Sequence, residues 1–232
     1  MKVAVINFSG NVGKTTISRH LLAPRIKDAE FVSIESINAD ESEADALRGR
    51  DFKQLQTYMQ VSENLIVDIG GSNVEDLLIK MRAFIGSHED FDYFIIPCVP
   101  DVKQQKDTAK TFKALVEMGV NPDHIKVVLN RVDQADTQAA TFENLAVVLH
   151  AYSPDAFDPA CSIMENEVFQ LAQDDGRSIS ELANDKTDFK VLIAKTADRS
   201  EKVALAEKLG LTRLARGVLP QLDACFAALK LA

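Results

Sequence analysis

Short apolar runs, separated by longer polar segments, are the feature of this chain that most restricts its fold. Each run is four to six residues long, which suits a buried β-strand and is too short for a buried helix. We therefore predict five strands. They lie at residues 2–6, 31–34, 64–69, 92–97 and 125–129.

The segments between these runs have the apolar spacing of helices. We predict helices at residues 14–23, 74–85, 102–118 and 140–150, and the spacing of Leu47, Leu55 and Met59 indicates helix in the stretch 40–63. Strands that alternate with helices form parallel sheets. The predicted fold class is therefore α/β, a doubly wound and mostly parallel sheet with helices on both faces. Ligands of such sheets bind at the carboxyl ends of the strands.

The alternation weakens beyond residue 150. Residues 162–163 are expected to begin either a last short strand or a loop. From about residue 176 the chain is predicted to be mostly helical, with a strand at the apolar run 189–194 (FKVLIA). We expect one core domain at residues 1–180 and a mainly helical C-terminal extension at residues 181–232, packed on the same domain.

Composition narrows the class of function. The 232 residues carry a net charge of −9, so contact with nucleic acid or anionic lipid needs a local basic patch. Three widely separated cysteines fit a reducing compartment, and no Cys-x-x-Cys or histidine cluster predicts a metal site. The opening MKVAVI is too short for a signal-peptide core, and no apolar run has membrane-spanning length. We expect a cytoplasmic protein without a stable membrane anchor.

The segment NFSGNVGKTT, residues 7–16, follows the first predicted strand and opens a helix. Glycines there let successive backbone N–H groups point inward, and the helix adds its positive end. A lysine then reaches the β- and γ-phosphates of a nucleotide, and a hydroxyl ligates magnesium. The residues that supply these parts are Gly10, Gly13, Lys14 and Thr15, with Thr16 placed toward the α-phosphate. A glycine turn that merely caps a helix is the alternative, which the strand–loop–helix context disfavours.

This segment resembles the deviant phosphate loop of the ParA/MinD group of P-loop ATPases, K-G-G-x-G-K-[ST]-T. The motif aligns with Ser9, Gly10, Asn11, Val12, Gly13, Lys14, Thr15 and Thr16. That group does not require glycine one position earlier, so Phe8 is compatible. The resemblance implies that these residues bind ATP or ADP with Mg²⁺, that Lys14 is catalytic and that Thr15 is a metal ligand.

The segment LIVDIGG, residues 65–71, is similar to the Walker B and switch II segment of the same group. The resemblance implies that Asp68 holds the magnesium through water and acts in catalysis, and that the N–H of Gly70 lies near the γ-phosphate. The alternative is that Asp68 is a strand-end carboxylate that caps the next turn.

The segment VVLNRVD, residues 127–133, resembles the part of these ATPases that binds the base. The Asn130 side chain offers a donor and an acceptor to an adenine edge, with Arg131 and Asp133 beside it. The same letters also resemble the N-K-x-D of GTPases, in which Asp pairs with guanine. A third interpretation is that Asn130 forms a turn. We favour adenine, because the other motifs belong to the ATPase branch. Residues 162–179 also resemble the ParA segment that packs beside the base, so the similarity covers about residues 1–180.

Two departures from the ParA/MinD pattern affect hydrolysis. Ser9 stands where the group has a signature lysine that reaches across a nucleotide-bound dimer, and Asn11 replaces a glycine. A charge supplied in trans at a transferring phosphoryl group is worth about 10³–10⁵ in rate. We therefore expect slow hydrolysis, or a cation from elsewhere. Candidates by residue type are Arg48, Arg50, Arg82 and Arg131, each of which suits the surface equally well.

A third departure, outside the phosphate loop, concerns the carboxylates that orient the attacking water. The group has Asp-x-Asp after its second strand, and here Glu35 aligns with the first Asp and Ile37 with the second. Ile37 cannot orient water, so Asp40 is the candidate catalytic carboxylate at this place. Its alternative is an exposed acidic face or the start of a helix.

The resemblance implies a nucleotide-dependent homodimer that acts as a switch in plasmid stability, segregation or positioning, with a plasmid-encoded DNA-binding partner. The Lys and Arg residues within 186–216 also suggest direct DNA binding. A charged helix face exposed to solvent is the better explanation of these residues. The apolar stripe of the last helix, from Leu219 to Leu231, has few basic residues and favours core or dimer packing over a membrane.

Two other functions stay open at this stage. One is a small-molecule ligase or kinase of the dethiobiotin synthetase type, which would need further lysines near the phosphates. The other is a module that binds nucleotide without hydrolysing it.

Overall fold

The computed structural model describes residues 1–35, 46–48, 52–133 and 138–231. The chain forms two compact units. The first comprises Met1–Glu165 together with Cys225–Ala232, and the second comprises Asn166–Ala224.

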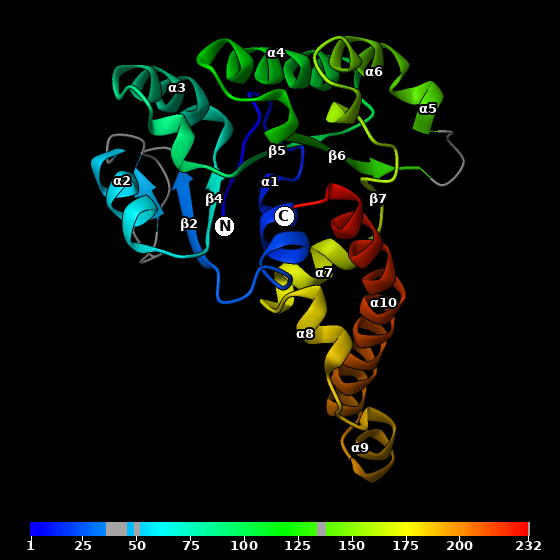
Figure 1. Cartoon of the computed structure of the whole chain (residues 1–232). Helices are drawn as coiled ribbons and strands as arrows, with labels where there is room; N and C mark the ends of the chain where they lie inside the picture. The colour runs from blue at the N-terminus through cyan, green and yellow to red at the C-terminus, as the bar shows by residue number, and fades with distance from the viewer. Residues whose placement is uncertain (36–45, 49–51, 134–137, 232) are drawn as a thin grey trace. The chain divides into compact units, whose positions relative to one another are not determined.

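A parallel sheet forms the centre of the first unit (Figure 1). In the part of the chain that the structure describes it has seven strands, in the order β3-β2-β4-β1-β5-β6-β7, and every neighbouring pair is parallel. The strands are β1 (Lys2–Val5), β2 (Glu30–Glu35), β3 (Ala46–Arg48), β4 (Leu65–Ile69), β5 (Tyr93–Cys98), β6 (Ile125–Val132) and β7 (Ser162–Met164). The predicted fold class, the five predicted strands and the short strand at 162 are confirmed.

The sheet explains why its strands read as continuous apolar runs. Every residue of β4 is buried, because helices cover both faces of the sheet. Each fully buried aliphatic side chain contributes roughly 1.5–3 kcal/mol of transfer free energy. Strand β1 lies between β4 and β5, with Val5 opposite both Asp68 and Ile95. Strands β2, β3 and β4 lie on one side of β1, and β5, β6 and β7 lie on the other, so the strand order changes direction at β1. In parallel sheets, ligands bind at such a point, outside the carboxyl ends of the strands.

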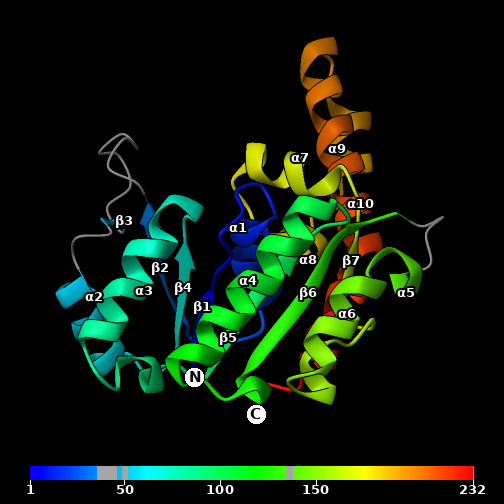
Figure 2. The ribbon, with the colours of Figure 1, turned by 90° about the horizontal axis from the view of Figure 1, so that it is seen from above.

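Helices cover the two faces as predicted (Figures 1 and 2). Helices α3 (Val74–Ala83), α4 (Val102–Met118) and α6 (Glu143–His150) lie over one face, and α1 (Lys14–Thr16) lies on the other. Helix α1 continues as a π-helix, η1 (Ile17–Leu22), in which Ala23 N–H bonds to Ser18 O. The remaining elements of this unit are α2 (Phe52–Val61), η2 (Gly71–Asn73), η3 (Ser87–Asp90), η4 (Pro122–His124), α5 (Gln138–Thr141) and η5 (Pro154–Ala156).

The second unit is helical. Its elements are α7 (Val168–Asp175), α8 (Ile179–Asn184), α9 (Phe189–Lys195) and most of α10 (Arg199–Leu229). Helix α8 begins at a capping box, in which Ser178 and Glu181 satisfy each other's backbone N–H groups.

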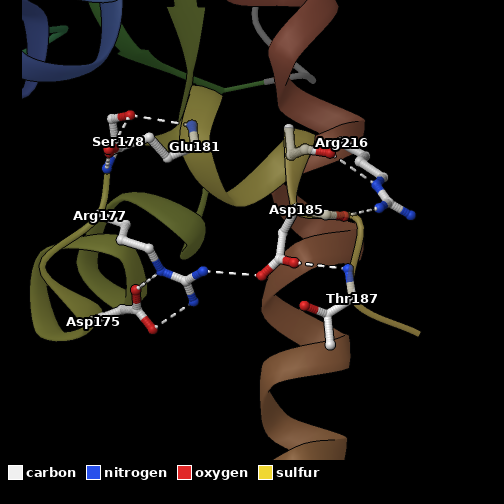
Figure 3. Close-up of polar contacts among 8 residues, drawn as sticks. Asp175, Arg177, Ser178, Glu181, Asp185, Thr187 and Arg216 are labelled. Atoms are coloured by element: carbon white, nitrogen blue, oxygen red, sulfur yellow. Dashed lines mark hydrogen bonds and ion pairs between the residues drawn. The ribbon is translucent and has the colours of Figure 1, made fainter. Parts of the chain in front are cut away.

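Two arginines connect the helices of this unit (Figure 3). Arg177 forms a bidentate pair with Asp175, at 2.6 and 3.1 Å, and a third bond to Asp185 at 3.0 Å. Arg216 of α10 donates to the carbonyls of Ala183 and Asp185 at 2.9 and 2.7 Å. The carbonyls at the end of α8, which have no partner within that helix, therefore obtain donors from α10.

Two local predictions were wrong. Residues 189–194 form helix α9, in which Asp188 accepts a bond from Val191 N–H at 3.1 Å and Phe189 is the buried residue. A six-residue apolar run is compatible with either state, and the second unit, as far as the structure describes it, contains helices and no strand. Leu47 lies in β3, where it pairs with Ile34 of β2, and the helix described in this region is Phe52–Val61.

The carboxylate of Asp185 makes the stability of the second unit depend on pH. Hydrogen bonds from Thr187, and then the Arg177 guanidinium, lower the pKa of Asp185 from 3.8 to about 2. Its stabilising effect is therefore fully present above pH 3.8 and is lost as the pH falls through 2. We predict that Asp185→Asn lowers Tm by about 1–4 °C at pH 7, and that the difference from wild type shrinks between pH 4 and pH 2.

Calorimetry across that pH range measures this difference. Asp174→Asn is the matched control, because Asp174 lies in the same unit and accepts one bond from Gln170. A deficit for Asp185→Asn that is equal at pH 7 and pH 2.5 would contradict the electrostatic origin.

Candidate functional site

The loop after β1 has the backbone of an anion cradle. Gly13 adopts φ +91° and Asn11 φ 57°, so both lie in the left-handed region. A Cβ at Gly13 would meet Asn130 Nδ2 at 2.1 Å, so the position is closed to any side chain. Helix α1 begins directly after Gly13, which places the loop at a helix N-terminus. The predicted strand–loop–helix arrangement is present.

Lys14 is buried inside this loop, with 8% of its surface exposed. Its ammonium donates to the carbonyls of Ser9 at 2.7 Å and Asn7 at 3.3 Å. Burial lowers the pKa of Lys14 from its ordinary value of 10.5, and the charge of Asp68 raises it in part. An ammonium held in this way has a third donor to offer to an anion that enters the loop.

Thr15 and Asp68 meet although they lie 53 residues apart. Thr15 Oγ1 donates to Asp68 Oδ2 at 2.6 Å, because β1 and β4 are adjacent and end at the same edge. A hydroxyl beside a carboxylate fits magnesium, which binds hard oxygen ligands and completes its shell with phosphates and water. No group of three or more His, Cys, Asp or Glu side chains that could hold a metal ion occurs among the described residues.

Ser9, at the position of the signature lysine, faces its own chain. Its hydroxyl donates to Asp107 Oδ2 of α4 at 2.5 Å, and its side chain is buried. Helix α4 contacts the neighbouring loop residues as well: Thr111 Oγ1 accepts from Phe8 N–H at 3.1 Å, and Gln104 Nε2 donates to Gly10 O at 3.4 Å. One face of α4 therefore fixes the first half of the loop.

Gly71 lies against the other side of the same segment. A Cβ there would meet Gly10 N and Phe8 O, both at 3.3 Å. The N–H of Gly70, which the resemblance places near the γ-phosphate, donates in this structure to Ile34 O of β2 at 2.8 Å. The segment after β4 thus packs on the phosphate loop through Gly71, while Gly70 bonds to the neighbouring strand.

The residues predicted near the base lie at the end of β6. Asn130 is buried, and its Nδ2 donates to Val12 O at 2.9 Å, so its amide is tied to the phosphate loop. Arg131 has φ 53° and, like Asp133, is exposed. The structure therefore brings Asn130 to the loop and leaves the next charged residues at the surface.

Of the remaining predictions, Asp40 and Ile37 lie outside the described residues, as does Arg50. Arg82 is exposed in the last turn of α3. Sequence reasoning missed Asn7 and the contacts of α4. A signal was available, since Thr108 and Thr111 are polar residues on the helix face that the apolar spacing of 102–118 assigns to the core, and both are fully buried.

Solved structures of three proteins resemble this one over nearly their whole length. Apo McdA from Cyanothece matches with a TM-score of 0.53 at 14% identity, covering 98% of each chain. MinD from Aquifex aeolicus matches with 0.53 at 13%, covering 95% of this chain and 97% of that one. The septum site-determining protein MinD from Pyrococcus horikoshii OT3, complexed with Mg-ADP, matches with 0.52 at 12%, covering 93% and 94%.

These matches show that the chain has the α/β fold of the McdA and MinD type, with a parallel sheet flanked by helices. McdA and MinD are ParA/MinD-type P-loop ATPases. No protein-family model matches the sequence, and no curated protein sequence matches it. Among the described residues, no helix is both long and apolar enough to cross a membrane.

Burial of Lys14 sets up a conflict between stability and binding. Because burial disfavours the ammonium, the folded state is destabilised below the lowered pKa, and this effect fades as the pH rises toward 10.5. We predict that Lys14→Met raises the stability of the ligand-free protein by about 1 kcal/mol, or roughly 2–4 °C in Tm at pH 7. The gain should shrink toward pH 10.

Thermal unfolding of both proteins between pH 7 and pH 10 checks this. A lower Tm for Lys14→Met at pH 7 would mean that the bonds to Ser9 O and Asn7 O outweigh desolvation.

Proposed function

We propose that this protein is an ATP-binding, magnesium-dependent P-loop ATPase of the ParA/MinD type that acts as a nucleotide-dependent switch. The observation that carries the proposal is the meeting of Thr15 with Asp68 beside the buried Lys14. If the loop were only a glycine turn that caps a helix, there would be no reason for the Thr15 hydroxyl to meet a carboxylate of the neighbouring strand β4.

The loop residues divide the work of binding. Backbone N–H groups between Gly10 and Thr15 surround the phosphates, and the Lys14 ammonium neutralises charge on the β- and γ-phosphates. Thr15 and Asp68 would hold magnesium, which neutralises phosphate charge when bound. Thr16, at the first turn of α1, bonds toward the α-phosphate.

The identity of the base is part of the proposal. We infer adenine, because the resemblance of the phosphate loop is to the ATPase branch and the fold is that of a MinD solved with Mg-ADP. Asn130 donates one amide hydrogen to Val12 O, and we propose that its carbonyl oxygen and second amide hydrogen bind the base. Arg131 and Asp133 are exposed next to it, and we propose that they border the base.

Hydrolysis is slow in this proposal. Ser9 brings no charge, and its hydroxyl is directed to Asp107 of the same chain rather than outward to a partner. Asp40 remains the proposed carboxylate for the attacking water. A nucleotide-binding module without turnover is the second candidate, and the same Ser9–Asp107 contact favours it.

The cellular context rests on sequence resemblance. The opening MKVAVINFSGNVGKTT, with LLAPR and VDIGGS, is similar to the plasmid stability protein StbB. We therefore propose a role in plasmid stability, segregation or positioning in the cytoplasm, as a nucleotide-dependent homodimer that works with a plasmid-encoded DNA-binding protein. The C-terminal residues 181–232 are proposed to be an extension of the core domain rather than a separate module.

The test begins with ATP binding by calorimetry, with and without magnesium. Wild type should bind, magnesium should strengthen binding, and Lys14→Ala should abolish it while leaving the fold intact, because the loop loses its charge. Lys27→Ala is the matched control, since the Lys27 side chain is 91% exposed. ATP binding by Lys14→Ala that equals wild type would refute the assignment of the loop.

The same samples then separate a switch from a module. Molar mass in solution should double with a nonhydrolysable ATP analogue and remain that of a monomer with ADP. Unchanged mass with both nucleotides, together with tight binding and no turnover, would favour the module. Turnover that requires an added small substrate would favour a ligase or kinase.

A further inference from the structure

Asn7 is the most extensively bonded polar residue of the loop region. It lies two residues after the end of β1, and no part of it is exposed. Its Nδ2 donates to Pro97 O of β5 at 2.8 Å and to Thr108 Oγ1 of α4 at 2.9 Å, and its Oδ1 accepts from Ser9 N–H at 2.8 Å. An amide with three partners in the protein interior is fixed in one orientation.

These bonds connect directly to Lys14. The Lys14 ammonium contacts two carbonyls, those of Asn7 and Ser9, at 3.3 and 2.7 Å. The Asn7 side chain bonds to the N–H of Ser9, so it spans the chain between these two carbonyls. Rotation of the Asn7 amide would break its bond to Ser9 N–H. The Ser9 carbonyl, which is the acceptor nearest to the Lys14 ammonium, would then lose this support.

Thr108 fixes the Asn7 amide from the side of α4. Thr108 Oγ1 donates to Gln104 O within the helix at 2.9 Å, which uses its one proton and turns an oxygen lone pair toward Asn7. Asp107, next in the helix, accepts from the Ser9 hydroxyl. Adjacent residues of α4 thus hold both ends of the segment that orients Lys14.

We propose that Asn7 is a positioning residue for the phosphate-binding lysine, and that Thr108 sets the orientation of its amide. The inference rests on the proposed function, because it assigns Lys14 to the phosphates. Asn7 does not touch the nucleotide. It holds the Asn7 and Ser9 carbonyls where they direct the ammonium into the loop.

Thr108→Val tests this with little change of shape. Valine keeps the branched side chain and removes the acceptor for Asn7. We expect ATP affinity to fall about tenfold, as for loss of one buried hydrogen bond, whereas Thr108→Ser keeps the hydroxyl and should restore affinity to within about twofold.

Thr57→Val is the matched control. Thr57 Oγ1 also donates to the carbonyl four residues earlier, Lys53 O, at 3.1 Å, but it lies on the exposed face of α2. Its ATP affinity should equal that of wild type. Affinities are measured by calorimetry on protein whose folded fraction is established by circular dichroism.

Asn7→Asp gives a second, independent reading. Aspartate has nearly the same shape as asparagine but cannot donate to Pro97 O or Thr108 Oγ1, so both amide bonds are lost. ATP affinity should therefore fall at least as far as it does in Thr108→Val. Asn64→Asp, remote from the loop, is the control for the change of residue type and should bind ATP like wild type.

The outcomes separate this inference from the proposed function. If wild type binds ATP and Lys14→Ala does not, but Thr108→Val and Asn7→Asp both bind like wild type, the positioning role is wrong and the proposed function stands. Equal losses for Thr108→Val and Thr108→Ser would also overturn it, because shape rather than the hydroxyl would be responsible. Failure of wild type to bind any nucleotide overturns both.

Discussion

The burial of one ammonium group against the backbone of its own loop is the interaction on which the proposed nucleotide site depends. Lys14 is held by two carbonyls, and its position requires the left-handed turn at Gly13 and the end of β1 at the sheet edge. The order of the strands then supplies the partner charge, because β4 lies beside β1 and carries Asp68 opposite Val5, the last residue of β1. A buried cation is tolerated where a nearby carboxylate and hydrogen bonds compensate its desolvation.

Helix α4 gives this loop a fixed support. Gln104, Asp107, Thr108 and Thr111 recur three or four residues apart, so they lie on one face of the helix and bond to Asn7, Ser9 and the residues between and after them. The position that carries a lysine in the ParA/MinD group is therefore used internally here. The Ser9 hydroxyl at this position bonds to Asp107 of α4 and so supports the loop, but it brings no charge. The slow hydrolysis that we propose and the internal support of the loop both follow from the contact between Ser9 and Asp107.

Much of the fold was predictable because strand length and apolar content are local properties. Residues 64–69 and 125–129 are apolar since helices cover both faces, and the same burial marks them in the sequence. The run 189–194 shows the limit of this reasoning. Its composition suits a strand, but pairing needs a neighbouring strand, and that depends on the tertiary structure. The helix start at Asp188 is a local signal that the apolar run obscured.

The candidate site was predictable where a motif records the chemistry, as at Lys14 and Asp68. It was not predictable where one side chain serves another. Asn7 follows β1 as an ordinary strand-end residue, and nothing in its neighbours reveals the contact with Thr108, 101 residues later. The role of Asn130 was open for the same reason, since a bond to Val12 O depends on how closely β6 approaches the loop.

A crystal structure of the protein with ADP and magnesium would show directly whether Lys14 binds phosphate. We expect the β-phosphate inside the loop between Gly10 and Thr15, with the Lys14 ammonium bonded to it and the metal next to Thr15 and Asp68. Nucleotide bound elsewhere, or a Lys14 ammonium that still contacts only the carbonyls of Asn7 and Ser9 with the nucleotide in place, would contradict it.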